Sequence, residues 1–252
     1  MQAKGILKGH PVSLHVLDYG LFRVHANGRI IGLCGFLIQT DAGEKILVDT
    51  GLPAKYTGDT EAASQEDRLY EFGDVLDCRP EHLPKAQLAR AGVSPDQITL
   101  HILTHSHIDH IGGLHDFPHA PILMSAVERA LPRPLYWAGN QPMEWPEADY
   151  VLVDSDVALG PGCQLFHVPG HAPGQLALML DLPETGPVLL TSDAISRPSE
   201  IDERFAGSWD AVQGLANARR LMAKAKARSA FVIYGHCPDQ WAGLRKAPEV
   251  YP

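Results

Sequence analysis

Three histidines and an aspartate crowd into six positions of the segment THSHIDHIGG, residues 104–113: His105, His107, Asp109 and His110. Neutral imidazole and carboxylate are ligands that suit zinc and also divalent iron, manganese or cobalt. One structural histidine would explain a single member of this set, but not its order and spacing. A catalytic ion keeps one coordination position open, so four ligands exceed what one such ion uses. The segment therefore predicts two neighbouring metal ions in one site, with this segment contributing ligands to both.

The residues around this segment favour a common ligand position. The apolar run ITLHILT, residues 98–104, predicts a buried strand that leads directly into the histidines. In an extended chain residues i and i+2 point to the same side, so His105 and His107 can reach one point at the end of that strand. The glycines of HIGG then turn the chain.

This HxHxDH pattern resembles the signature of the metallo-β-lactamase superfamily. The resemblance implies further ligands, each at the end of a strand, and FHVPGHAPGQ, VLLTSDAIS and FVIYGHCPDQ supply His171, Asp193 and His236. It implies that the first metal is held by His105, His107 and His171. It implies that the second is held by Asp109, His110 and His236, with Asp193 as the bridge.

Three further expectations about the centre follow from the resemblance. Asp109 and Asp193 are expected to take part in catalysis as well as in binding. Asp49 of ILVDTG matches another family signature and is expected to orient a ligand imidazole. The cofactor is expected to be two divalent ions. Zinc is the default, because no sulfur ligand selects among zinc, iron, manganese and cobalt.

The rest of the chain predicts an α/β fold with strands at the N-terminus and strands interleaved with helices after them. Residues 12–26 and 32–51 predict strands, with DAGEK as a hairpin connection. Residues 120–134 predict a strand and a short helix, and further strands are expected at 151–153, 164–168, 175–181, 187–191 and 229–236. Helices are expected at 81–92 and 209–228, the second with Val212, Leu215, Ala216 and Met222 on its apolar side.

The resemblance extends from about residue 12 to about residue 240. It implies an αββα sandwich of two mixed β-sheets flanked by helices, with the metals at one edge. The length of 252 residues and the lack of a low-complexity linker predict a single domain over residues 1–252.

Composition narrows the expected partners and location. The net charge of −9 disfavours binding to a phosphate backbone, so no nucleic-acid partner is expected. The longest apolar runs are shorter than a membrane span, and the N-terminus lacks the pattern of a signal peptide. The four scattered cysteines fit a reducing compartment. We therefore expect a cytoplasmic protein, monomeric or homodimeric, that acts on a small molecule.

Two cations beside one water molecule favour hydrolysis, because they lower its pKa and polarise the oxygen under attack. The resemblance refines this expectation, since β-lactamases of the superfamily generally lack the bridging aspartate. The segments THSHIDHIGG, PGHAPGQ, SDA and GHCPDQWAGLRKAPEVY look most like the N-acyl-homoserine lactonase group. That likeness implies quorum quenching, in which a metal-bound hydroxide opens a lactone ring.

Other functions remain open at this point. A glyoxalase II-like thioesterase or another esterase would use the same two metals, although the short segment after His236 counts against the glyoxalase II branch. The acidic charge counts against a nuclease. The complete ligand set counts against a sensor without catalytic activity.

One residue departs from the lactonase pattern. Many of these enzymes have a tyrosine three residues after the bridging aspartate, where this chain has Ser196. A serine hydroxyl is too short to make the same contact with a substrate carbonyl. Tyr19, Tyr56 and Tyr136 are therefore candidates for a replacement donor.

Two long segments could enclose a substrate. The aromatic, proline-rich residues 132–150, which include Tyr136 and Trp137, predict either the wall of a hydrophobic pocket or an ordinary packed loop. Residues 53–80 are polar with weak periodicity and could form a second lid. The histidines without ligand spacing near the cluster, His101 among them, are expected to be hydrogen-bonded or at the surface.

Overall fold

Long apolar and alternating runs at the N-terminus form the central hairpin of the first β-sheet. The computed structural model describes residues 2–252. β1 (Pro11–Val24) pairs antiparallel with β2 (Ile30–Thr40), and β2 pairs antiparallel with β3 (Lys45–Val48) across the predicted DAGEK turn. β5 (Leu100–Ile102), β6 (Ile122–Ser125) and β7 (Tyr150–Val153) continue the sheet in parallel. With β4 (Gly73–Asp77) at its other edge, the sheet is mixed.

The second half of the chain forms a smaller mixed sheet. Its strands are ordered β12-β11-β10-β9-β8. They are β8 (Val157–Gly160), β9 (Cys163–His167), β10 (Leu176–Leu182), β11 (Gly186–Leu190) and β12 (Phe231–Ile233). Only the β11–β12 pair is parallel among these described strands.

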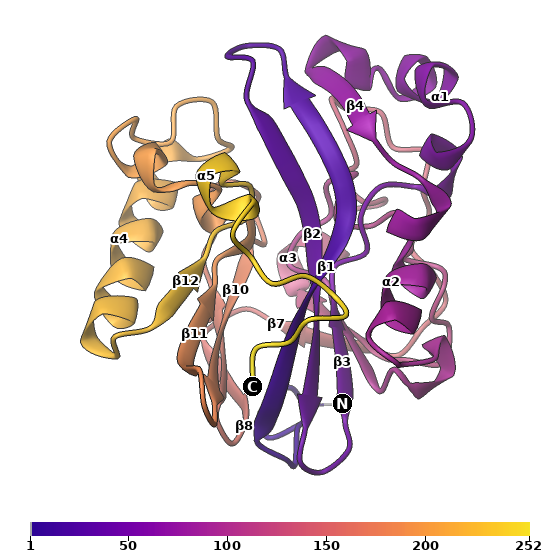
Figure 1. Cartoon of the computed structure of the whole chain (residues 1–252). Helices are drawn as coiled ribbons and strands as arrows, with labels where there is room; N and C mark the ends of the chain where they lie inside the picture. Colours follow the sequence, from indigo (N-terminus) through magenta and orange to yellow (C-terminus); the bar gives the residue numbers. More distant parts are fainter. Residues whose placement is uncertain (1) are drawn as a thin grey trace.

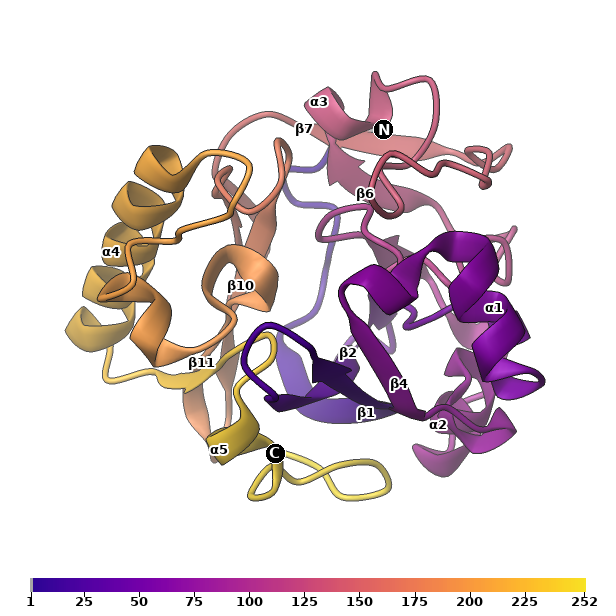
Figure 2. The same cartoon turned by 90° about the horizontal axis from the view of Figure 1, so that it is seen from above.

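The two sheets face each other, and helices cover their outer sides (Figures 1 and 2). α1 (Thr60–Asp67) and α2 (Pro84–Arg90) lie beside the first sheet, and α4 (Ala211–Ala227) covers the second. α3 (Ala126–Arg129) and α5 (Pro238–Trp241) are single turns. One apolar cluster fills the space between the sheets, and two more lie under the outer helices. The predicted αββα sandwich is thus confirmed.

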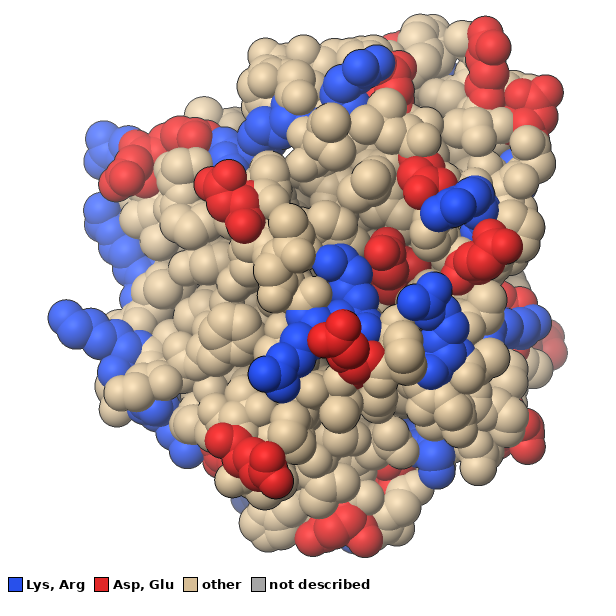
Figure 3. All heavy atoms as spheres, in the orientation of Figure 1, with Lys and Arg blue, Asp and Glu red and all other residues tan. Residues whose placement is uncertain are grey.

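Short 3₁₀ turns connect many of these elements. They lie at η1 (Ala54–Thr57), η2 (Leu69–Glu71), η3 (Pro80–His82), η4 (Pro95–Gln97), η5 (Ser192–Ile195) and η6 (Pro198–Ile201). Within residues 2–252, every helix is too short or too polar to cross a membrane. On the face drawn in Figure 3, basic and acidic side chains are interspersed among larger uncharged areas.

The structure corrects the predicted face of the last long helix. Leu215 and Met222 pack half-buried against the cluster under the helix, as predicted, but Val212, at 80% exposed, and Ala216 face outward. The fully buried side consists of Gly214, Ala218, Leu221 and Ala225. Small residues on this side let the helix approach closely: a Cβ at Gly170 would lie 2.3 Å from the Cα of Gly214. The positions of the apolar residues did not identify the buried side of the helix, because glycine and alanine are only weakly hydrophobic. This close approach holds the loop with residue 171 against α4.

Two strands lie where no strand was predicted. β4 falls inside the polar segment 53–80, and β8 is an edge strand of four residues. Both are short and half exposed, so their sequences carry little periodicity. The adjoining α1 is capped by Asp59, whose side chain accepts a hydrogen bond from the amide of Ala62 at 2.9 Å.

Candidate metal centre

The predicted ligands come from four loops that meet at one edge of the sandwich. The first loop follows β5, the second joins β9 to β10, the third is η5 after β11, and the fourth follows β12. The structure gathers their side chains into overlapping groups whose ligand atoms lie within 4.8 Å of one another: His105, His107 and His171; His105, His110 and Asp193; and Asp109, His110 and His236. All seven predicted ligands are thus in one place, although they span 132 positions of the chain, from 105 to 236.

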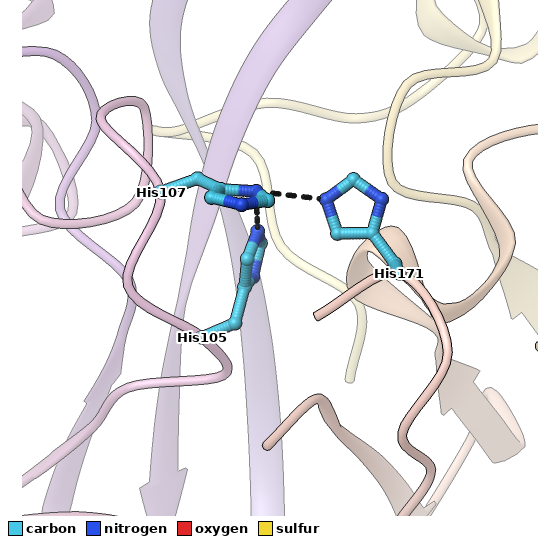
Figure 4. A group of neighbouring side chains, drawn as sticks. All are labelled: His105, His107 and His171. Atoms are coloured by element: carbon cyan, nitrogen blue, oxygen red, sulfur yellow. Dashed lines mark hydrogen bonds between the residues drawn. The ribbon is translucent and has the colours of Figure 1, made fainter. Parts of the chain in front are cut away.

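Three imidazoles converge in the first group (Figure 4). His107 Nδ1 lies 3.0 Å from His105 Nε2 and 2.9 Å from His171 Nε2. Burial lowers the pKa of all three, most strongly for His105 and to about 3 for His107. Repulsion between neighbouring imidazolium charges acts in the same direction. The group therefore presents neutral rings, which is the form that binds a metal.

Carboxylates dominate the second group. His236 Nε2 lies 3.4 Å from Asp109 Oδ2, and His110 Nε2 lies 3.7 Å from the same oxygen. Burial opposes positive charge on His110, but Asp109, Asp49 and Asp193 outweigh it and raise its pKa to about 9. The pKa of His236 is likewise raised well above its usual value despite burial. The carboxylates thus favour positive charge at this point.

Asp193 lies between the two groups. Its Oδ2 is 3.3 Å from His171 Nε2, and its Oδ1 is 3.1 Å from His236 Nε2. Burial would raise its pKa, but His236, His171 and His110 together hold it well below the usual range. A single carboxylate therefore faces both sets of imidazoles, as a bridging ligand must.

Two buried atoms test whether metal ions fit here. Among residues 2–252, His110 Nε2 and Asp193 Oδ1 are buried and make no hydrogen bond of good geometry, even though His236 Nε2 lies 3.1 Å from that oxygen. Unpaired polar atoms are costly inside a protein, and metal coordination would satisfy them. The donor set of imidazoles and carboxylates suits a divalent ion. The residues therefore fit divalent metal ions.

Asp49 supports the centre from behind, where it was predicted to orient an imidazole. Its Oδ2 lies 2.8 Å from His110 Nδ1, and its carboxylate accepts hydrogen bonds from the amide and hydroxyl of Thr104 at 2.9 and 2.7 Å. This contact points His110 Nε2 toward the other ligands. The left-handed backbone of Asp49, with φ of 57°, begins the turn of ILVDTG.

A second such contact was not predicted. His236 Nδ1 lies 2.9 Å from the backbone carbonyl of Gly32 on β2. Gly32 has no room for a side chain, because a Cβ would lie 2.1 Å from the ring of Trp241. Every residue has a backbone carbonyl, so the residue type does not reveal this acceptor. The only signal in the sequence is the glycine itself.

A cavity of about 470 Å³ opens beside the ligands. Ser196 and Trp137 line it, as do Phe72, Arg29, Glu200 and Trp209. Phe72 and Trp137 pack at 4.8 Å between ring centroids, so the segments 53–80 and 132–150 supply one aromatic wall. Ser196 and Trp137 were predicted to line the pocket, and Phe72 lies in the segment 53–80 that was predicted as a possible lid. Arg29, Glu200 and Trp209 were not predicted, because their loops carry no ligand motif.

Tyr136 was predicted to lie in the substrate pocket, and the structure corrects this prediction. Its side chain is 1% exposed, it is not among the cavity-lining residues, and its hydroxyl donates to Asp67 Oδ2 at 2.8 Å. Tyr56 donates to the same oxygen at 2.9 Å. Asp67 is fully buried and needs these donors, so it draws both phenols away from the cavity.

The remaining candidate donor and one other histidine also differ from expectation. Tyr19 donates to the backbone carbonyl of Asp49 at 3.1 Å and does not line the cavity. His101, expected to be hydrogen-bonded or exposed, is fully buried, and neither ring nitrogen has a hydrogen-bond partner within residues 2–252. Its ring instead packs edge-on against Phe117, with centroids 6.1 Å apart.

Comparison with known proteins agrees with this architecture. Residues 31–236 match the family model of the metallo-β-lactamase superfamily. An N-acyl homoserine lactonase of a Bacillus species is 31% identical over 227 residues, covering 85% of this chain and 84% of that protein. The N-acyl homoserine lactonase AttM of Rhizobium radiobacter is 31% identical over 183 residues, covering 66% and 68%.

A solved structure gives the same result at the level of fold. It is an N-acyl homoserine lactone hydrolase with the product N-hexanoyl-L-homoserine bound at its catalytic metal centre. It aligns with a TM-score of 0.77 and 25% identity, over 96% of this chain and 100% of that one. The family model spans most of the chain, and the relatives agree with it. This chain therefore belongs to the metallo-β-lactamase superfamily.

Proposed function

We propose that this protein is a hydrolase with two divalent ions that opens the ring of N-acyl-homoserine lactones or similar lactones. The observation that carries the proposal is the position of Asp193, which faces both ligand groups and lines a cavity. The names of the relatives support the substrate class, since they are N-acyl homoserine lactonases. Zinc is the metal that we expect first, with iron, manganese and cobalt as alternatives.

The proposed ligand sets are those that the resemblance to the superfamily implied. His105, His107 and His171 would hold one ion, and Asp109, His110 and His236 the other, with Asp193 shared. When bound, such ions lower the pKa of water and polarise a carbonyl oxygen. Asp49 fixes the orientation of His110 for this purpose.

The residues around the ions would orient the substrate and handle protons. Lactone hydrolysis adds water to the carbonyl carbon, breaks the ring C–O bond and moves a proton to the ring oxygen. The carboxylate of Asp109 lines the cavity and can hold that proton in transit, whereas Asp193, whose two oxygens face both ligand groups, would balance the charge of the ions. Phe72 and Trp137 offer an apolar wall to the acyl group.

A thioesterase or other esterase with the same metals is the second candidate. It is favoured by Ser196, which stands where many lactonases have a tyrosine. The engagement of Tyr19, Tyr56 and Tyr136 elsewhere also favours it, because none of the three replaces that donor. Carbonyl activation would then depend on the metals and the remaining cavity residues.

A hydrolysis screen with a pH indicator would distinguish these functions. One metal-loaded preparation would be offered N-acyl-homoserine lactones, other lactones, thioesters, phosphodiesters and a β-lactam. We expect the highest kcat/KM on lactones and none on the β-lactam. Turnover of thioesters without lactones would replace the proposal with the second candidate.

We also propose that the chain acts as one domain in a reducing cytoplasm. The apolar cluster between the sheets includes residues from both halves of the chain, from Ala3 to Tyr251. The four cysteines, at positions 34, 78, 163 and 237, are all free thiols.

A further inference from the structure

Glu128 is a buried acid that the proposed chemistry does not use. It lies on α3, away from the cavity, and it is 0% exposed. Its Oε2 accepts hydrogen bonds from the amide and hydroxyl of Ser106 at 2.7 and 2.6 Å. Its Oε1 accepts a hydrogen bond from the amide of Gly174 at 3.1 Å. A carboxylate without hydrogen-bond donors is costly to bury. The three donors around the Glu128 carboxylate therefore stabilise it in this position.

These three hydrogen bonds join two loops that carry ligands. Ser106 stands between His105 and His107, and Gly174 follows His171 by three residues. Both loops carry ligands of the first group, and the loop of Gly174 carries no ligand of the second; the loop of Ser106 also carries Asp109 and His110, but Glu128 makes no such contact to a ligand of the second group itself. The carboxylate therefore sets the distance between the two halves of the three-histidine group.

The surroundings of the carboxylate allow little adjustment. At Gly174 a Cβ would lie 1.7 Å from Ser125 Oγ and 2.9 Å from Glu128 Cγ, so the loop passes directly over the acid. Ser106 Oγ, which donates to Glu128, also accepts a hydrogen bond from the amide of Leu135 at 3.1 Å. The bonds thus fix backbone positions rather than flexible side-chain ends.

We propose that Glu128 is a positioning residue that sets the affinity of the ion held by His105, His107 and His171. It does so by fastening the loop of Ser106 to the loop of Gly174. This inference rests on the proposed two-ion centre. Residues that orient metal ligands from behind typically change affinity ten- to a hundredfold when they are replaced.

Glu128→Gln tests this role, because it keeps the shape but replaces one acceptor oxygen by an NH₂ group, which cannot accept from the amides of Ser106 and Gly174. The metal-free chain and its variants would be titrated with zinc against a chromophoric chelator. His171→Ala would identify the ion of the first group, and His236→Ala the ion of the second. We expect Glu128→Gln to weaken the first ion at least tenfold and the second less than threefold.

Asp67→Asn is a matched control. Asp67 is also a fully buried acid held by several donors, namely Tyr56, Tyr136, Lys55 and Asn140, but it makes no hydrogen bond to a ligand loop itself. We expect it to lower stability while leaving both zinc affinities within threefold. Amide exchange of Ser106 and Gly174 in the metal-free chain should accelerate in Glu128→Gln and not in Asp67→Asn.

Several results would overturn the role of Glu128. They are an unchanged first affinity, an equal loss at both ions, or the same loss in Asp67→Asn. If Glu128→Gln does not fold, Ser106→Ala removes one bond of the three and should still weaken the first ion selectively; no change there also counts against the role. A wild-type chain that binds no ion contradicts the proposed function as well. A chain that binds two ions but opens no lactone contradicts the substrate class alone.

Discussion

At the scale of single residues, the charge of Asp193 is the feature on which the proposed chemistry depends most. Asp193→Asn keeps the shape of the side chain but removes the negative charge that faces His171 and His236. We expect kcat on a lactone to fall at least roughly a hundredfold, as when one electrostatic stabiliser is lost. Steady-state kinetics and metal analysis of the same preparation measure this. Normal turnover with two ions bound would exclude a bridging role.

Ser196 is expected to matter less. It lines the cavity, and its backbone amide donates a hydrogen bond to Glu200 Oε2 at 2.7 Å. A change of the side chain leaves this hydrogen bond in place. Ser196→Ala should change kcat/KM only a few-fold, since a neutral hydrogen bond is worth about 0.5–1.5 kcal/mol.

Ser196→Tyr is the complementary variant, and it should preserve or raise activity on N-acyl-homoserine lactones. Tyr136→Phe is a suitable control, because its hydroxyl is bound to Asp67 outside the cavity. That control should lower stability with little effect on kcat. A large loss of kcat in Tyr136→Phe, at unchanged metal content, would show that this phenol contacts the substrate after all.

At the scale of elements, β5 carries a histidine that makes stability depend on pH. Burial lowers the pKa of His101 to about 4, below its ordinary value of 6.5. The unfolded chain therefore binds more protons between these values, and the stability due to the neutral ring is lost as pH falls from about 6.5 to about 4. The full effect is about 3 kcal/mol.

His101→Leu should remove this contribution. Because neither ring nitrogen has a hydrogen-bond partner in the described structure, an apolar side chain of similar size should leave stability at pH 7 unchanged or higher. Urea unfolding of both proteins between pH 4 and 7 measures the difference. Parallel pH profiles for the two proteins would show that His101 is not buried in neutral form.

The elements also show what could be predicted from sequence. The strand before His105 could be predicted from the sequence, because an apolar run ends at a motif whose ligands share one face. β4 and β8 were not, since short edge strands lack a strong period. The burial of Tyr136 depends on Asp67, 69 positions away, and its distance in sequence hides that pairing. Glu128 was overlooked for the same reason, since it bonds Gly174 across 46 positions.

At the scale of the whole molecule, the four ligand loops join both sheets across the edge of the sandwich. Ions that bind only the folded chain should therefore stabilise it as a unit. At a free concentration a thousandfold above Kd, one ion contributes about 4 kcal/mol, which corresponds to about 8–16 °C in Tm for a chain of this size. Calorimetry with and without a chelator measures this. An unchanged Tm would mean that the loops are held without metal.

The number of bound ions tests the central claim most directly. Elemental analysis of protein purified gently without chelators, and then loaded with zinc, should approach two equivalents per chain. This value follows from two ligand groups that meet at Asp193. A clean single equivalent that resists further loading would contradict the two-ion centre.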